Sequence, residues 1–219
     1  MHQISFPPVR DRLEGLSPGA RMSADVLIMQ NIPSREGYQY VFFIVDDATK
    51  ICWVYSLKTR VQIHLGASYD LCYRGVAVSE YHLRYFHSDG GAELVAADVL
   101  TFLHKSGVTT SHSPRDTPQM NSITERCFCS LKEKVLCMLL RSSLPVAFWW
   151  LAVECAAHLL NRLPTKTVLG YMSPYECVDG AAPDLKWIRI WGCKCYALKP
   201  KADRRKDFDE KAYTRFLVV

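Results

Sequence analysis

The segment from Tyr85 to Leu140 places the tightest constraint on how this 219-residue chain can fold. It reads as a short strand that leads to Asp89, a helix closed by Gly107, a second short strand, a loop and a long helix. Strands that alternate with helices in this way predict a mixed sheet with helices packed on its faces.

Two acids lie at the ends of elements in this segment. Asp89 follows the first strand and is itself followed by two glycines, which let a ligand approach the backbone closely. Glu125 lies near the start of the long helix, where the helix dipole favours its anionic form. The two acids are separated by 35 residues, 90–124. Two such carboxylates that converge with a third would hold divalent cations for phosphoryl-transfer chemistry.

Three strand-like runs precede this segment. Residues 22–29 form a short apolar run that contains Asp25. Residues 38–45 and 51–57 are rich in β-branched and aromatic side chains, and the short turn between them predicts an antiparallel hairpin.

The long helix has one apolar face at about 100° per residue. Glu125 and Lys132 are seven residues apart and therefore lie roughly 20° from each other at the edge of that face. A metal-binding acid and a phosphate-binding base would then point the same way, although a solvated surface lysine explains Lys132 equally well. A further helix is expected to begin with Ser143 as its capping residue and to run to about Asn161.

Composition narrows the class of protein without naming a function. Hydrophobic residues make up 49% of the chain and charged residues 22%, as in a globular protein with a true core. The net charge of +5 permits a nucleic-acid partner but does not require one. Nine cysteines without an apolar leader predict an intracellular location. The longest apolar run, 144–163, carries charged residues and favours a buried helix over a membrane span, so no membrane partner is expected.

Several motifs, taken together and in order, resemble the core of retroelement integrases. The motifs are HSDGGAE at 87–93, TPQMN at 117–121 and Glu125-Arg126, and the pattern is similar to that of the copia type of LTR retrotransposon. Motifs of the same family's helix and tail follow at 144–149, 161–164, 173–176 and 191–193. The resemblance implies an α/β fold of the ribonuclease H-like class, with a mixed five-stranded sheet flanked by helices.

The resemblance also implies a catalytic triad and its cofactor. Asp25, Asp89 and Glu125 match the family's three acids and would bind two Mg²⁺ (or Mn²⁺) ions. Asp46 and Asp47 compete with Asp25 for the first position, but both lie in a predicted turn, where aspartate commonly bonds its own backbone. The cysteine pairs have one residue between them rather than the two to four of zinc sites, so we expect no zinc site.

The partner implied by the resemblance is DNA, both the ends of the element and its target. Gln119 and Asn121 match the family's DNA-proximal loop, and Arg126 and Lys132 are candidates for phosphate contacts. We expect a homo-oligomer, at least a dimer, that acts in the nucleus after a stage in a cytoplasmic particle. Two alternatives stay open: a catalytically silent module for nucleic-acid binding or dimerisation, and a metal nuclease that cuts without joining.

Three regions are expected along the chain. They are a linker at 1–19, the catalytic core at 20–165, and a loop-rich, basic and truncated C-terminal extension at 166–219. Ser122 and Gly90 stand where the family has glycine and asparagine, and no zinc module precedes the core. These departures predict a fragment of a polyprotein, or a decayed or domesticated copy.

Overall fold

A five-stranded mixed sheet forms the centre of the computed structural model, which describes residues 16–59, 62, 83–88, 97–112, 122–167, 170–203 and 210–218. Its strand order is β3-β2-β1-β4-β5. The first three strands are antiparallel, whereas β4 pairs parallel with both β1 and β5. The bounds are β1 Arg21–Ile28, β2 Tyr40–Asp46, β3 Cys52–Leu57, β4 Tyr85–Ser88 and β5 Thr109–His112. The predicted hairpin and the mixed sheet are confirmed.

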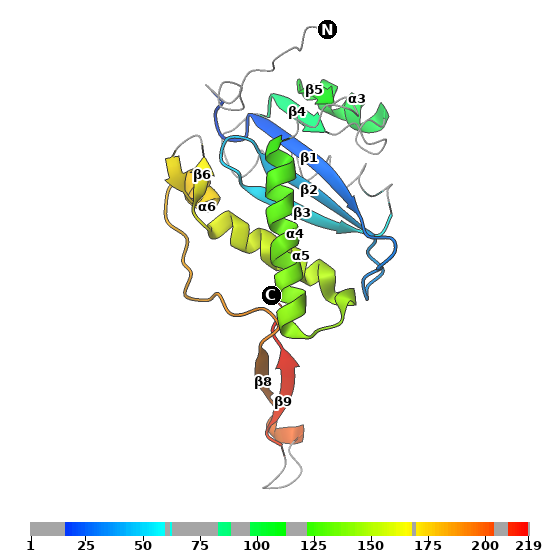
Figure 1. The fold of residues 1–219 in the computed structure, drawn as a ribbon, viewed down its shortest axis with the longest axis vertical. Coiled ribbons are helices and arrows are strands. Elements are labelled where there is room, and N and C mark those ends of the chain that lie inside the picture. Colours follow the sequence, from blue (N-terminus) through cyan, green and yellow to red (C-terminus); the bar gives the residue numbers. More distant parts are fainter. Residues whose placement is uncertain are drawn as a thin grey trace.

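On one face of the sheet, the helix α3, Ala97–Lys105, packs beside β4 and β5 (Figure 1). Side chains of alternate positions on the strands pack with this helix because successive strand residues point to opposite faces. The buried cluster on this face consists of Met22, Ala24, Phe42, Ile44, Leu83, Phe86, Leu103 and Val108. Gly107 ends the helix in the left-handed conformation, with φ +75°, as the sequence indicated.

The opposite face is covered by α4, Ser122–Ser142, and α5, Trp149–Arg162. Figure 1 shows α4 running across the sheet. Val41, Phe43 and Val45 of β2 form the floor of this second cluster, and Phe128, Leu131 and Trp149 pack upon it. The predicted apolar stripe of α4 is confirmed at Cys127, Leu131, Val135, Met138 and Leu139, all of which pack in this cluster.

The start of α5 differs from the prediction. Ser143 does not cap a helix; it has a left-handed backbone, φ +56°, and its side chain is exposed. A 3-10 turn, η3 Val146–Phe148, comes first, and the cap position of α5 is Phe148, which makes no side-chain cap bond. The hydroxyl of Ser142 instead accepts a hydrogen bond from the Leu144 amide at 3.2 Å. A tight connection between α4 and α5 therefore takes the place of the expected serine cap.

The far end of α5 is anchored to the sheet by Asn161. Its Oδ1 accepts a hydrogen bond from the Cys52 amide, and its Nδ2 donates to the Cys52 carbonyl, each at 2.8 Å. A side-chain amide can satisfy both backbone groups of one residue in this way. Asn161, which the sequence grouped with a family motif, thus ties the last turn of α5 to the start of β3.

The C-terminal region contains more regular structure than the loop-rich segment expected. Its elements are β6 Thr165–Thr167, β7 Gly170–Met172, α6 Pro174–Asp179, β8 Lys194–Leu198, η4 Lys201–Asp203 and β9 Ala212–Phe216. Ser173 caps α6 by accepting a hydrogen bond from the Glu176 amide at 3.1 Å, with Pro174 in the first turn. This cap was readable from the sequence and was missed.

The β8–β9 hairpin projects beyond the C-terminal end of α4 (Figure 1). Trp191 is buried at its base, and its indole N–H donates to the Val218 carbonyl at 3.2 Å. A Cβ added at Gly192, which has φ +73°, would lie 2.2 Å from the Cβ of Ser142. Glycine is required there both by the backbone conformation and by the close approach to α4.

Candidate active site

Asp25 lies in β1 on the face covered by α4. Its neighbours Ala24 and Val26 pack on the α3 face, so Asp25 points to the opposite side. The side chain is half-buried, and its Oδ1 accepts a hydrogen bond from the Val26 amide at 2.7 Å. Its cross-strand partner in β2 is Phe43. The strand therefore holds this carboxylate beside an aromatic ring that faces α4.

Glu125 lies in the first turn of α4 and is exposed. Phe128, three residues further along the helix, packs against Phe43 with 5.6 Å between the ring centroids. Thr124, the residue before Glu125, is fully buried. Because residues three apart lie on neighbouring parts of a helix surface, the Phe43–Phe128 contact brings the helical turn of Glu125 over the strand pair that carries Asp25.

Asp89 lies outside the described residues, so the structure places two of the three predicted acids. Ser88, the last residue of β4, pairs in parallel register with Ala24, and Asp25 directly follows Ala24. Within the described residues no group of three or more His, Cys, Asp or Glu side chains is close enough to hold a metal ion.

The donor chemistry of the two placed acids fits Mg²⁺ or Mn²⁺. Both ions prefer carboxylate oxygens and commonly use only one or two protein carboxylates besides water. Glu125 is exposed in the first turn of α4. Its oxygens are therefore accessible to an ion.

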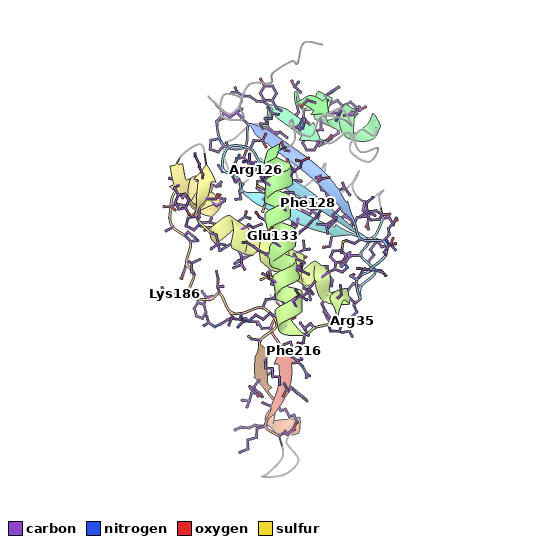
Figure 2. The ribbon with its side chains drawn as sticks, in the orientation of Figure 1. Arg35, Arg126, Phe128, Glu133, Lys186 and Phe216 are labelled. Atoms are coloured by element: carbon purple, nitrogen blue, oxygen red, sulfur yellow. The ribbon has the colours of Figure 1, made fainter. Side chains whose placement is uncertain are left out.

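The predicted DNA-contacting residues fall into two groups. Gln119 and Asn121 lie outside the described residues. Arg126 and Lys132 are exposed on α4, and the Lys132 ammonium lies 4.3 Å from the centroid of the Phe128 ring. Figure 2 shows Arg126 and Phe128 in the N-terminal half of α4. The cation–π contact draws Lys132 toward the side of the helix on which Glu125 was predicted to lie.

Asp46 and Asp47, the competing candidates for the first acid, are both buried: Asp46 is the last residue of β2, and Asp47 begins the turn that follows. Asp46 accepts hydrogen bonds from the amide and hydroxyl of Thr49, at 2.8 and 2.6 Å, and from the Gly19 amide at 3.0 Å. This is the local turn bonding that the sequence predicted. Its carboxylate is fully engaged on the α3 side of the sheet.

Asp47 has a role that sequence reasoning did not find. Its Oδ1 accepts a hydrogen bond from the Ser23 hydroxyl at 2.8 Å, and its Oδ2 lies 2.9 Å from Nε of Arg21. Both partners belong to β1 and precede Asp25 on the same face. No sequence signal marks this contact, because it joins residues 24 and 26 positions apart.

Burial raises the pKa of Asp47 from 3.8 to about 6, although the Ser23 hydrogen bond and the charges of Arg21 and Lys50 lower it. A carboxyl whose pKa is higher in the folded chain binds its proton more tightly there. The contribution of Asp47 to the free energy of unfolding should therefore fall as pH rises from 3.8 to about 6.

Urea unfolding of the unaltered protein and of Asp47→Asn at several pH values tests this sign. Asparagine does not titrate, so the free energy of unfolding of the unaltered protein minus that of the variant should decrease across the window and level off above it. A difference that increases with pH would show that the Arg21 ion pair outweighs the cost of burial.

Comparisons with known proteins identify the domain and the fold. The family model described as "Integrase core domain" matches residues 16–118. Among solved structures, the HTLV-2 integrase catalytic core domain in complex with magnesium (trimeric form) aligns with a TM-score of 0.55 at 16% identity, covering 75% of this chain and 99% of that one. The catalytic core domain of BIV integrase aligns with a TM-score of 0.51 at 16% identity, covering 74% and 95%. The fold is that of retroviral integrase catalytic cores, which confirms the predicted ribonuclease H-like class.

Sequence comparison shows which integrase-containing proteins the chain is similar to. The chain is 31% identical over 179 residues to the retrovirus-related Pol polyprotein from transposon RE1 of Arabidopsis thaliana. It is 28% identical over 215 residues to that from transposon TNT 1-94 of Nicotiana tabacum. These alignments cover 80% and 96% of this chain but only 12% and 16% of the relatives. The chain therefore carries an integrase core domain and is similar over most of its length to copia-type retrotransposon Pol polyproteins.

None of the helices in the described part of the chain combines the length and apolar character needed to cross a bilayer.

Proposed function

We propose that this chain is the catalytic core of a retrotransposon integrase and carries out divalent-metal-dependent polynucleotidyl transfer on DNA. The reactions would be processing of 3′ ends and transfer of those ends into target DNA. The observation that carries the proposal is the contact of Phe43 with Phe128, which brings the strand of Asp25 under the first turns of the helix of Glu125. The family match supports the same conclusion.

Three acids would hold the ions: Asp25, Asp89 and Glu125. A bound divalent ion supplies charge neutralisation at the scissile phosphate and a more acidic nucleophile. The Val26 amide restrains the Asp25 carboxylate through its hydrogen bond. Glu125 lies in the first turn of α4 and is exposed. Magnesium in the related HTLV-2 structure supports Mg²⁺, or Mn²⁺ in its place.

DNA is the proposed partner, as both element ends and target. Arg126 and Lys132, both exposed on α4, would contact phosphates beside Glu125, and Gln119 and Asn121 are proposed contacts of the preceding loop. We propose residues 20–165 as the catalytic unit and 166–219 as an appended region. Assembly into a homo-oligomer is supported by the trimeric form of the related core. Joining of DNA ends to chromosomal DNA would take place in the nucleus.

The direct test uses a labelled element-end duplex, Mn²⁺ and an unlabelled target DNA. We expect shortened 3′ ends and, in addition, labelled products longer than the substrate, which arise only from joining. Disintegration of a branched substrate is the less demanding companion assay. Shortened products without joined ones would point to a simple nuclease. DNA binding by a folded protein without either reaction would point to a silent binding module.

Substitution Lys132→Ala should weaken DNA binding and reduce its dependence on salt. Loss of one phosphate contact lowers the slope of log affinity against log salt concentration by about 0.9 for duplex DNA. Fluorescence anisotropy over a salt series measures both quantities.

The matched control is Lys186→Ala. The Lys186 side chain is 82% exposed, and its contact with Asp184 is weak at 3.7 Å. It lies away from the N-terminal half of α4 (Figure 2). Equal effects of the two substitutions would show that the protein binds through its general charge and not through α4.

A further inference from the structure

A row of polar side chains lies on the same face of the sheet as Asp25, in register with Ser23, two residues before Asp25 on β1. Arg21, Ser23 and Asp25 share this face because same-face residues of a strand are two apart. Ser23 pairs in register with His87 of β4, and His87 pairs with Ser111 of β5. The His87 Nδ1 and Ser111 Oγ are 2.9 Å apart. The row therefore runs across β1, β4 and β5 at the same-face position that precedes Asp25.

Asp47 contacts the β1 members of this row, Ser23 and Arg21. The residue is 2% exposed, and each carboxylate oxygen is used, one by the Ser23 hydroxyl and one by the Arg21 guanidinium. Its backbone amide also donates to the Arg21 carbonyl at 3.0 Å. One buried residue thus fixes two of the β1 residues that lead to Asp25.

The same turn also meets the helix that carries Glu125. Lys50 has a left-handed backbone, φ +67°, and its ammonium donates a hydrogen bond to the Asp47 carbonyl. The ammonium is close enough to Cys127 and Arg126 for both to act on it electrostatically. Those two residues follow Glu125 on α4. Residues 47–50 thus contact the strand of Asp25 and lie within electrostatic reach of the helix that carries Glu125.

We propose that Asp47 is a positioning residue of the active site. Through Ser23 and Arg21 it sets the place of Asp25 on β1, and through the turn that ends at Lys50 it holds that strand against the first turns of α4. The inference rests on the proposed function, in which Asp25 and Glu125 bind metal ions. Loss of a residue that orients metal ligands typically lowers metal affinity or activity about 10–100-fold.

Asp46 provides a matched control because it is equally buried and one residue away. Its carboxylate accepts hydrogen bonds from Thr49 and Gly19, on the opposite face of the sheet. Asp46→Asn and Asp47→Asn are the same chemical change and should both destabilise the fold. Of the two acids, Asp47 is the one whose carboxylate contacts β1 residues on the face that carries Asp25.

The experiment measures Mn²⁺ binding by water-proton relaxation at neutral pH, for the full chain without DNA. Asp47→Asn should raise the Kd for Mn²⁺ about tenfold or more, in the range found for residues that orient metal ligands. Asp46→Asn should leave the Kd within about twofold, because no ligand-orienting contact is lost. Urea unfolding of each variant confirms that the fraction of folded protein is the same in every titration.

Ser23→Ala covers the case in which Asp47→Asn does not fold. It removes one bond to Asp47 and keeps every charge, so a smaller rise in Kd is expected. Unchanged Kd in the folded variants at Asp47 and Ser23, or an equal rise in Asp46→Asn, would overturn the positioning role. Glu125→Gln separates this failure from failure of the proposed function: Mn²⁺ binding that survives Glu125→Gln, or no saturable binding by the unaltered chain, overturns the proposed function and the inference with it.

Discussion

Asp25→Asn and Glu125→Gln are each expected to abolish Mn²⁺-dependent end processing and strand transfer while the protein stays folded. The ions are worth several kcal/mol of transition-state stabilisation, and each step of about 1.4 kcal/mol is a factor of ten in rate, so a loss on the order of a thousandfold is expected. Both substitutions keep the size of the side chain and remove its charge. Single-turnover rates on a labelled element-end duplex measure the effect.

Glu133→Gln is the matched control for the helix. Glu133 is exposed on the same helix, eight residues after Glu125 (Figure 2). The same chemical change there should leave the rate within about twofold, as surface substitutions away from a site usually do. Asp89→Asn completes the series and should match Asp25→Asn. Full activity after any of the three substitutions in the triad would mean that the acids are wrongly assigned.

Trp149→Ala is expected to lower the free energy of unfolding by about 3–5 kcal/mol, the usual cost of removing a buried tryptophan. Trp149 is 1% exposed and lies where α5 packs on β2. Its indole N–H also donates to the Ile32 carbonyl at 2.8 Å, and that carbonyl would be left unpaired. Urea unfolding followed by circular dichroism measures the change in the free energy of unfolding.

Trp187→Ala is the matched control, since Trp187 is 81% exposed. Its substitution should change the free energy of unfolding by no more than about 0.5 kcal/mol. Trp149→Phe, which keeps most of the buried volume and loses the hydrogen bond, should fall between the two. Equal effects of Trp149→Ala and Trp187→Ala would contradict the described packing of α5 against the sheet.

Local pattern predicted most of the elements that carry the site. The apolar run of β1, the hairpin of β2 and β3, and the stripe of α4 each follow from a period of two or 3.6 residues, which depends only on neighbours in the chain. The hydrogen bonds of Asp46 to Thr49, three residues further along the chain, were predicted from the same kind of local pattern. The predicted start of α5 was wrong because Ser143 has a left-handed backbone conformation in the connection between α4 and α5. The close ends of these two packed helices set the geometry of that connection.

The sequence alone was enough for the mixed sheet with helices on its faces and for the strand of Asp25 and the helix of Glu125, because periodicity depends on neighbours in the chain. The ribonuclease H-like class followed from the motif resemblance, and the assignment of the three acids stays a prediction. Tertiary structure alone decided that Phe43 meets Phe128, that Asn161 ties α5 to β3, and that Asp47 bonds Arg21 and Ser23. These contacts join residues 24 to 109 positions apart. Which of many compatible side chains meet at such separations depends on how the whole core packs, and no local pattern encodes it.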